Sequence, residues 1–350
     1  MFICLGMYNI AFFSYSTIIA LENINDLQDE VIVTQEALNN LEGYVTINLK
    51  PGEKITYEDL LYGTMLPSAA DCANQIEISI SGNVEQFVEL MNQKAKELGL
   101  ENTHFSNPIG MDDDNYSTTK EMAEILKYAL KNEEFYKIFT TKEYTTKNNK
   151  KLQNTIIEKS QKENVDSSII LGSKTGFTDE AGYCLATISK INNINYLLVT
   201  TNAETEKEYH VIDALNIYDY YSKNYSYKKI LSYNQILKKI KVEDAITKEY
   251  EIKSDNDIYQ YINNDIDINN LTYEYEGIEE VTRKTNTNNE IGKIKIKNGE
   301  EILYTYNIYL KEIPLYNFKR YLLSLIISVM IIGIILIKYI KIFTNNKNIW

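Results

Sequence analysis

Residues 169–188 read IILGSKTGFTDEAGYCLATI, and the rest of the first half of the chain can be organised around this stretch. Two apolar runs, Ile169–Leu171 and Tyr183–Ile188, have the composition of strands. The glycines around Lys174-Thr175-Gly176 predict a turn between the two runs. The stretch therefore predicts neighbouring strands joined by a turn that presents a lysine and a threonine, and an ordinary structural turn is the alternative interpretation.

Cap patterns on both sides of this stretch predict helices. A hydroxyl or amide side chain followed three residues later by an acid or amide is typical of a helix start, and glycine is typical of a helix end. By these rules we expect helices at Tyr57–Met65, from Ser68 with Asp71, from Asn83 with Gln86 to Gly99, from Thr118 with Glu121 to about Leu130, and at Val211–Tyr221, with a further strand at Asn195–Thr201.

The composition of the sequence changes at about Tyr227, where glycine becomes scarce and segments with alternating apolar and polar residues appear. Residues Gly292–Gly299 predict a strand followed by a turn, and Tyr304–Leu310 predicts the returning strand. We therefore expect a first domain over 1–225, a small β domain over 226–315, a membrane segment over 321–337 and a short tail over 338–350.

The run Tyr321–Ile337 is almost wholly apolar and is flanked by Lys319-Arg320 and Lys338. A helix needs about 20 such residues to cross a bilayer, so the run predicts a single span. A buried core helix is the alternative, but such a helix is expected to show a polar face. Four aromatic residues are candidates for the membrane interfaces: Tyr316, Tyr321, Tyr339 and Trp350.

The N-terminal residues Met1–Leu21 are apolar and uncharged. A signal peptide is one interpretation, with Ser14-Tyr15-Ser16 as its cleavage site, although no Lys or Arg precedes the apolar run. A buried helix that runs into Ala20-Leu21-Glu22-Asn23 is the other.

Composition excludes several classes of function. The formal net charge of -13 disfavours nucleic-acid binding, which needs clustered Lys and Arg. The 3 cysteines, Cys4, Cys72 and Cys184, are too widely spaced for a disulfide framework or a Cys-x-x-Cys metal site. The 2 histidines, His104 and His210, form no cluster, so we expect both to be surface or packing residues and expect no metal and no cofactor.

Taken in order, four stretches resemble the serine-type D-alanyl-D-alanine carboxypeptidases, the low-molecular-weight penicillin-binding proteins. The resemblance covers roughly Thr17 to Ala203 and implies a β-lactamase-like α/β fold, with a sheet flanked by helices, followed by a small β domain and a membrane anchor. The four stretches are Leu49–Thr56, Asp59–Gly63, Asn102–Pro108 and Lys174–Leu185.

That family works through three motifs, S-x-x-K, S-x-N and K-T-G. The resemblance implies that Lys174, Thr175 and Gly176 bind the terminal carboxylate of a cell-wall peptide ending in D-Ala-D-Ala, and that the Phe177 N–H stabilises the oxyanion. Ser68 stands in the second motif, where it would relay a proton, but Ala70 replaces the asparagine. Ser68 is alternatively only a helix cap.

The first motif is not found at its expected position. Counting back from Ala20 puts Phe13 at the lysine position and Ile10 at the serine position, and no Lys or Arg occurs before Lys50. The nucleophile and its base are therefore expected to be absent from this chain, and the central sheet is expected to lack edge strands beside the K-T-G strand. A mis-called start, a frameshift and a degenerate paralogue remain open as explanations.

Two literal S-x-x-K matches are interpreted as accidental. Ser117-Thr118-Thr119-Lys120 follows the second motif and is explained by the Thr118 cap, and Ser226 with Lys229 falls at the domain junction.

Two functions follow from the resemblance. The first is a membrane-anchored carboxypeptidase of peptidoglycan maturation, which cleaves the terminal D-Ala through an acyl-enzyme and reacts with β-lactams if an active parent exists. The second is a non-catalytic pseudoenzyme that binds wall peptide or an active paralogue. In either case the resemblance implies that residues 1–315 lie outside the cytoplasm, with Lys338, Lys341 and Lys347 on the inner side.

Overall fold

The computed structural model describes residues 10–109, 114–179, 181–243, 245, 248–282, 285, 288–311 and 318–345. The chain divides into two compact units, Met1–Lys223 and Asn224–Trp350, and each is described by itself.

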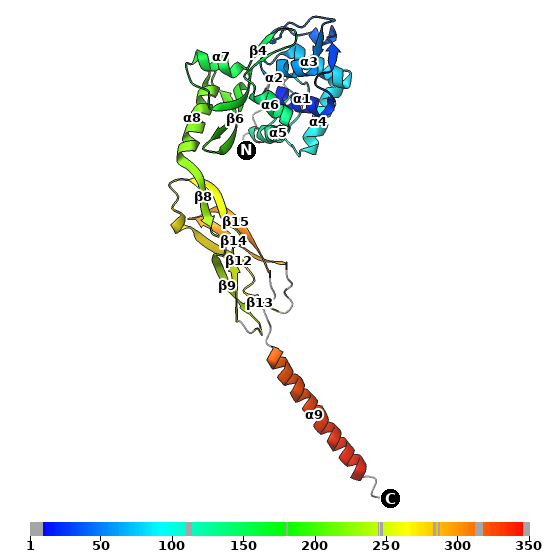
Figure 1. Ribbon diagram of the computed structural model, residues 1–350, viewed down its shortest axis with the longest axis vertical. Coiled ribbons are helices and arrows are strands. Elements are labelled where there is room, and N and C mark those ends of the chain that lie inside the picture. Colours follow the sequence, from blue (N-terminus) through cyan, green and yellow to red (C-terminus); the bar gives the residue numbers. More distant parts are fainter. Residues whose placement is uncertain are drawn as a thin grey trace. The chain divides into compact units, whose positions relative to one another are not determined.

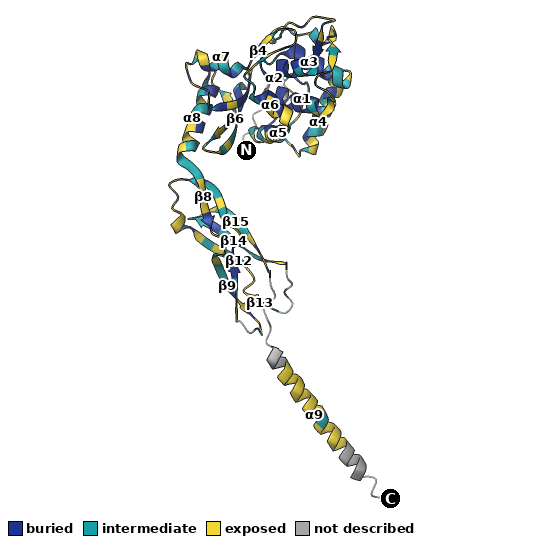
Figure 2. Ribbon diagram, in the orientation of Figure 1, coloured by how far each residue is buried: buried dark blue, intermediate teal, exposed yellow. Residues whose placement is uncertain are grey.

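A layer of helices forms most of the first unit and encloses its main core (Figure 1). The burial colours show the core-facing residues of this layer in dark blue (Figure 2). The helices are α1 (Ile10–Asn23), α2 (Tyr57–Met65), α3 (Ala70–Ser81), α4 (Val84–Glu97), α5 (Thr119–Ala129) and α6 (Glu133–Thr140), with a 3-10 turn at Glu36–Leu38.

The caps predicted from sequence begin three of these helices. Thr56, Asn83 and Thr118 each accept a hydrogen bond from the backbone N–H three residues later, at 3.2, 2.8 and 3.1 Å respectively. A satisfied cap typically stabilises a helix by about 1 kcal/mol, which explains why these local signals were reliable. The cap expected from Ser68 was wrong, since α3 begins at Ala70 after Ala69, with no side-chain cap.

Helix α1 is buried from Phe13 to Ala20. Phe13, Tyr15, Ile18 and Ile19 are each at most 2% exposed and belong to the main core. Tyr15 stacks on Phe105 with ring centroids 4.7 Å apart. The interpretation of this stretch as a buried helix is therefore confirmed over its described residues, while residues 1–9 lie outside them.

The central sheet contains β5 (Ile170–Thr178), β6 (Gly182–Ile191) and β7 (Ile194–Ala203), antiparallel in that order. The prediction of a turn at Lys174-Thr175-Gly176 was wrong, because these residues lie inside β5 and pair with Ala186, Leu185 and Cys184 of β6. Cross-strand pairing overrides the local preference of the glycines. No described strand pairs with the outer edge of β5.

The second face of the sheet packs against α7 (Thr155–Lys162) and α8 (Tyr209–Asn224). Ile156, Leu185, Val211 and Tyr218 form the centre of this smaller core. Two short hairpins complete the unit: β1 (Glu30–Ile32) pairs with β2 (Lys54–Thr56), and β3 (Glu143–Thr145) pairs with β4 (Lys151–Gln153).

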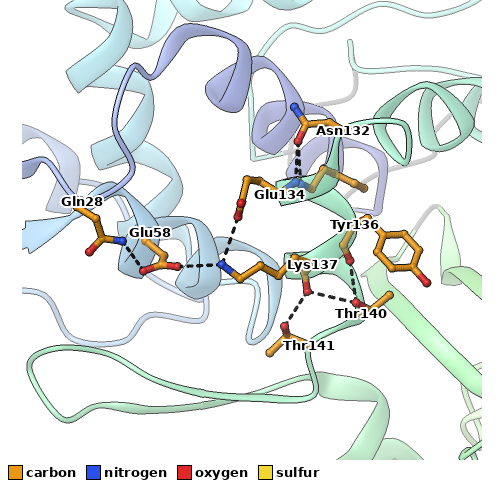
Figure 3. A network of polar contacts seen from close by, with 9 residues as sticks. Gln28, Glu58, Asn132, Glu134, Tyr136, Lys137, Thr140 and Thr141 are labelled. Atoms are coloured by element: carbon orange, nitrogen blue, oxygen red, sulfur yellow. Dashed lines mark hydrogen bonds and ion pairs between the residues drawn. The ribbon is translucent and has the colours of Figure 1, made fainter.

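Helix α6 lies against β5 and leaves no room for a side chain at Gly172. A Cβ added there would lie 2.5 Å from Cδ1 of Phe139 and 2.8 Å from its carbonyl oxygen. On the other side of α6, the ammonium of Lys137 lies between Glu134 of its own helix and Glu58 of α2, which also accepts from Gln28 (Figure 3). Helix α6 thus connects the helical layer to the strand that carries the predicted motif.

The second unit is a β domain with its own core, in which Ile294 and Ile296 are fully buried. The predicted hairpin is confirmed, since β14 pairs antiparallel with β15 as well as with β12. Its strands are β8 (Tyr225–Leu231), β9 (Ile236–Val242), β10 (Glu249–Lys253), β11 (Ile258–Asn263), β12 (Thr272–Gly277), β13 (Glu280–Val281), β14 (Glu290–Asn298) and β15 (Glu301–Tyr309), with a 3-10 turn at Ile268–Asn270.

Helix α9 (Phe318–Asn345) contains one segment that is long and apolar enough to cross a membrane, Leu322–Tyr339, with a mean hydropathy of 2.5 and 0% of its residues buried. The burial colours show the described part of α9 as almost entirely exposed (Figure 2). The alternative of a buried core helix is therefore wrong. The interfacial candidates Tyr316 and Trp350 lie outside the described residues.

Candidate functional site

Lys174 is the centre of the candidate site and is only 1% exposed. Its Nζ donates to Oγ of Ser68 at 2.5 Å and to the carbonyl oxygen of Thr175 at 2.7 Å. The same Nζ lies 4.9 Å from the ring centroid of Phe13 on α1. Three segments far apart in sequence thus meet at one amine.

Burial sets the protonation of this amine. It lowers the pKa of Lys174 from 10.5 to about 7, and the positive charge of Lys159 acts on the pKa in the same direction. In the part of the chain that the structure describes, Lys174 forms no ion pair with a carboxylate that would offset this effect. The Phe13 ring offers a weaker, cation–π stabilisation of the charged form. At neutral pH the amine is therefore close to half protonated.

Ser68 lies in the short connection between α2 and α3 with a φ of 64°, in the left-handed region that serine rarely adopts. Strain of this kind costs about 1–3 kcal/mol and is found where the surroundings enforce it. The next two backbone N–H groups are fixed, Ala69 to the Gly63 carbonyl at 3.0 Å and Ala70 to the Val45 carbonyl at 2.8 Å. Ser68 is therefore not a cap but a residue held with its hydroxyl against Lys174.

A buried carboxylate stabilises the segment in front of this connection. Asp71 is 1% exposed and accepts from the N–H groups of Ile47, Leu49 and Cys72 at 3.2, 3.0 and 3.0 Å. The acid that the sequence suggested as part of a helix start therefore serves to hold the loop 47–49 against α3.

Thr175 is joined to the start of α7, a contact that the sequence analysis missed. Its hydroxyl lies 2.7 Å from that of Thr155, and Asn154, which caps α7, bonds to Ser173 of β5 through both its amide oxygen and its amide nitrogen. Thr155 also donates its N–H to the Leu66 carbonyl at 3.3 Å. The sequence could have predicted Asn154 as a helix cap, but no neighbouring residue in the sequence predicts its hydrogen bonds to β5.

The remaining predicted residues lie at the end of β5 and on two helices. Gly176 pairs with Cys184, and Phe177 is 41% exposed with its ring 5.1 Å from that of Tyr183. Ala70, which the sequence analysis assigned to the asparagine position of the second motif, is buried as the first residue of α3. Ile10 begins α1, but its side chain lies outside the described part.

A basic cluster borders the site. Lys159 and Lys162 both pair with the nearly buried Glu208, at 2.9 and 2.7 Å, and Lys159 lies over the Tyr183 ring at 4.6 Å. His210 is fully buried beside Tyr183, and burial lowers the pKa of its imidazole to about 4. His210 is thus a neutral packing residue, as expected, while His104 pairs through its backbone with Tyr116 on the surface.

The two literal S-x-x-K matches do not form reactive pairs. Ser117 is buried and bonds to Thr103 at 2.7 Å, whereas Lys120 is exposed. Ser226 bonds to Asn264, and Lys229 pairs with Asp257. The Thr118 cap that explained the first match is confirmed, and it stays a prediction that neither serine is a nucleophile.

Solved structures define the class of this fold. DacD from Francisella tularensis superposes with a TM-score of 0.72 over 89% of this chain and 88% of its own, at 18% identity. Penicillin-binding protein 5 from Haemophilus influenzae superposes with a TM-score of 0.67 over 88% of this chain and 90% of its own, at 21% identity. The fold is therefore that of the penicillin-binding proteins: an α/β unit followed by a β domain.

Sequence comparison defines the family. The family model of D-alanyl-D-alanine carboxypeptidases matches residues 17–205, and the model of the C-terminal domain of penicillin-binding protein 5 matches residues 225–314. The carboxypeptidase DacF of Bacillus subtilis is 31% identical over 291 residues, which are 82% of this chain and 73% of the relative. The chain belongs to the D-alanyl-D-alanine carboxypeptidase family.

Other relatives are matched over a smaller part of their length. The carboxypeptidase DacA of Haemophilus influenzae is 35% identical over 157 residues, which are 44% of this chain and 39% of the relative. The resemblance seen in the sequence motifs is thus confirmed as family membership, while the chemistry of this particular chain depends on its own residues.

Proposed function

We propose that this chain binds cell-wall peptides ending in D-Ala-D-Ala at the site around Lys174, as a membrane-anchored protein of peptidoglycan maturation. The observation that carries the proposal is the buried Lys174 amine, which has hydrogen-bond partners but no carboxylate partner among the described residues. A peptide carboxylate would supply the missing charge and make the short, charge-assisted hydrogen bonds that favour such pairs.

The neighbouring residues support this choice of ligand. The Thr175 hydroxyl, positioned by Thr155, is a second donor for the carboxylate, and Gly176 and Phe177 continue the strand toward the exposed end. An extended peptide can add to the outer edge of β5, where the main-chain groups have no described strand partner. Ser68 would contact the same end of the peptide through its bond to Lys174.

Hydrolysis through the family's first motif is disfavoured by the residues of α1. That chemistry needs a serine and a lysine one helical turn apart. Counting back from Ala20 assigns Ile10 and Phe13 to those positions. The Phe13 ring, which lies beside Lys174, cannot accept a proton. Binding of wall peptide without release of D-alanine is therefore the function that these residues favour.

The proposed site is tested by calorimetry on the full chain in detergent micelles, with the peptide diacetyl-L-lysyl-D-alanyl-D-alanine as ligand. Its C-terminal amide should bind about 10–100-fold more weakly, as expected when a hydrogen bond to a charged group is lost. Lys174→Met should weaken binding of the free acid to a similar extent, while the exposed control Lys120→Met should not. Equal affinity for the acid and the amide would refute the proposal.

The pH dependence gives a second readout of the same site. Because the carboxylate binds the charged amine, and the pKa of Lys174 in the free protein is about 7, the dissociation constant should be level below this pH. Above it, the constant should rise by about tenfold per pH unit. Release of D-alanine from the peptide, or covalent labelling by a fluorescent penicillin, would contradict binding without turnover.

A further inference from the structure

We infer that Ser68 and Lys174 form a nucleophile–base pair of their own, which lets Ser68 react with acyl donors that carry no free carboxylate. The inference goes beyond peptide binding but uses the same amine, so it rests on the proposed site. It starts from the 2.5 Å contact between Ser68 Oγ and Lys174 Nζ, the distance at which a base receives a proton directly.

The hydrogen bonds of Lys174 leave the lone pair of the neutral amine free to accept a proton. A neutral amine has two N–H donors and one lone pair. One N–H is used by the Thr175 carbonyl oxygen at 2.7 Å, which can only accept. When the amine is neutral, its lone pair becomes available, and the Ser68 hydroxyl at 2.5 Å is within reach to donate its proton to it.

Access to the two groups differs in the way that a reactive pair requires. Lys174 is 1% exposed, whereas Ser68 is only partly buried and offers more of its surface to solvent. The strained backbone of Ser68, with its φ of 64°, holds the hydroxyl in the connection before α3 rather than at a helix cap. A reagent that approaches from solvent therefore meets the Ser68 hydroxyl before the Lys174 amine.

Burial keeps the base available near neutral pH. The low dielectric surroundings lower the pKa of Lys174 to about 7, so that roughly half of the molecules carry a neutral amine at that pH. Lys159 contributes in the same direction through its charge. A lysine in water, with a pKa of about 10.4, would be almost wholly protonated under these conditions.

Transfer of the acyl group to Ser68 needs no proton donor or acceptor other than Lys174 and the leaving group. The Ser68 proton moves to the Lys174 lone pair as the Oγ–carbon bond forms, and the bond from the acyl carbon to the leaving group breaks. The leaving group then takes the proton from the Lys174 ammonium, which regenerates the neutral amine. With a fluorophosphonate the new bond is Oγ–phosphorus, the bond that breaks is phosphorus–fluorine, and fluoride leaves.

The test uses the full chain in detergent micelles and a biotinylated fluorophosphonate, a probe without a carboxylate. Peptide mapping by mass spectrometry should find one adduct, on Ser68. The labelling rate should rise about tenfold per pH unit below a pH of about 7 and level off above it. Ser68→Ala should abolish the adduct, and Lys174→Met should slow labelling by about 10²–10⁴-fold, the usual contribution of a general base.

Ser117→Ala is the matched control, because Ser117 belongs to a literal S-x-x-K match but lies outside the pair. It should label like the wild type. The pH profile of the unmodified chain needs no variant to fold, so it tests the inference even where Lys174→Met is unstable. Absence of an adduct on Ser68 at pH 9, or an adduct on Ser117 instead, would overturn the inference.

The same preparation separates the two proposals. Labelling of Ser68 without measurable peptide binding would retain the reactive pair and reject the peptide site. Lys174-dependent peptide binding without any Ser68 adduct would retain the peptide site and reject the reactive pair.

Discussion

Replacing Lys174 by methionine should change the pH dependence of folding stability in a way that follows from the buried amine. The pKa of Lys174 falls from 10.5 to about 7 on folding. Lowering a pKa by one corresponds to about 1.4 kcal/mol of free energy, so keeping this amine charged in the folded state costs about 5 kcal/mol. Methionine has a similar length and shape but carries no charge to desolvate.

The direction of the effect is fixed by which state binds the proton. Between a pH of about 7 and 10.5 the unfolded chain has a charged Lys174 and the folded chain a neutral one, so unfolding takes up a proton. Stability from this group therefore rises with pH across that window, by up to about 1.4 kcal/mol per pH unit. Below a pH of about 7 both states are charged, and the full cost remains.

The assay is urea unfolding of wild type and Lys174→Met at pH 7, 8 and 9, followed by circular dichroism. Circular dichroism is used because the single tryptophan, Trp350, belongs to the second unit. Methionine also loses the bonds to Ser68 and Thr175, which are worth about 1 kcal/mol each and do not change with pH. The stability advantage of the variant should shrink steadily as the pH rises. A difference between the two proteins that stays constant from pH 7 to 9 would refute a buried, deprotonating Lys174.

Three further predictions concern the frame around the site and the membrane segment. Gly172→Ala should destabilise the first unit by about 1–3 kcal/mol, because the new Cβ would overlap Phe139 of α6. The control Gly333→Ala, whose Cβ meets no atom within 4 Å, should leave the stability unchanged. Equal melting temperatures of the two variants would contradict the packing of α6 on β5. Asp71→Asn should lower the free energy of unfolding in urea by about 1–3 kcal/mol, because an amide nitrogen would face an N–H donor that the carboxylate now accepts from. The exposed Asp213→Asn is the control. Equal stabilities of the two variants would show that Asp71 does not stabilise the loop 47–49 against α3. An epitope inserted after Asn298 should be digested by protease on intact protoplasts, as expected if Leu322–Tyr339 anchors the chain with residues 1–315 outside. Complete protection of the epitope would place these residues inside.

The helices of the first unit could be predicted because their ends depend on neighbours in sequence. The Thr56, Asn83 and Thr118 caps each bond three residues along the chain, so the pattern contains the whole interaction. The hairpin of β14 and β15 was predictable for the same reason, since its turn and its alternation are local. The apolar helix was predictable from its length and composition alone.

The interactions that form the site are not local, and the sequence could not predict them. The bond between Ser68 and Lys174 joins residues 106 positions apart, and the bond between Thr155 and Thr175 joins the start of α7 to the middle of β5. The glycines near Lys174 suggested a turn because their local preference was counted without the pairing to β6. Ser68 suggested a cap because Asp71 follows it by three residues, whereas its positive φ is enforced by the surrounding backbone, which no sequence pattern records.

Peptide binding and serine activation require opposite protonation states of one amine, and this links the two proposals. A ligand with a carboxylate stabilises the charged form of Lys174, which can hold the ligand but cannot take a proton from Ser68. A ligand without a carboxylate leaves the neutral form populated, because burial lowers the pKa of Lys174 to about 7. A second lysine at position 13 would separate the two tasks, as the first motif does in the family, but here Phe13 lies beside Nζ instead. With a single amine for both tasks, the charge of the ligand decides whether the site binds or reacts, so a wall peptide with a free carboxylate is bound in the state in which Ser68 is least nucleophilic.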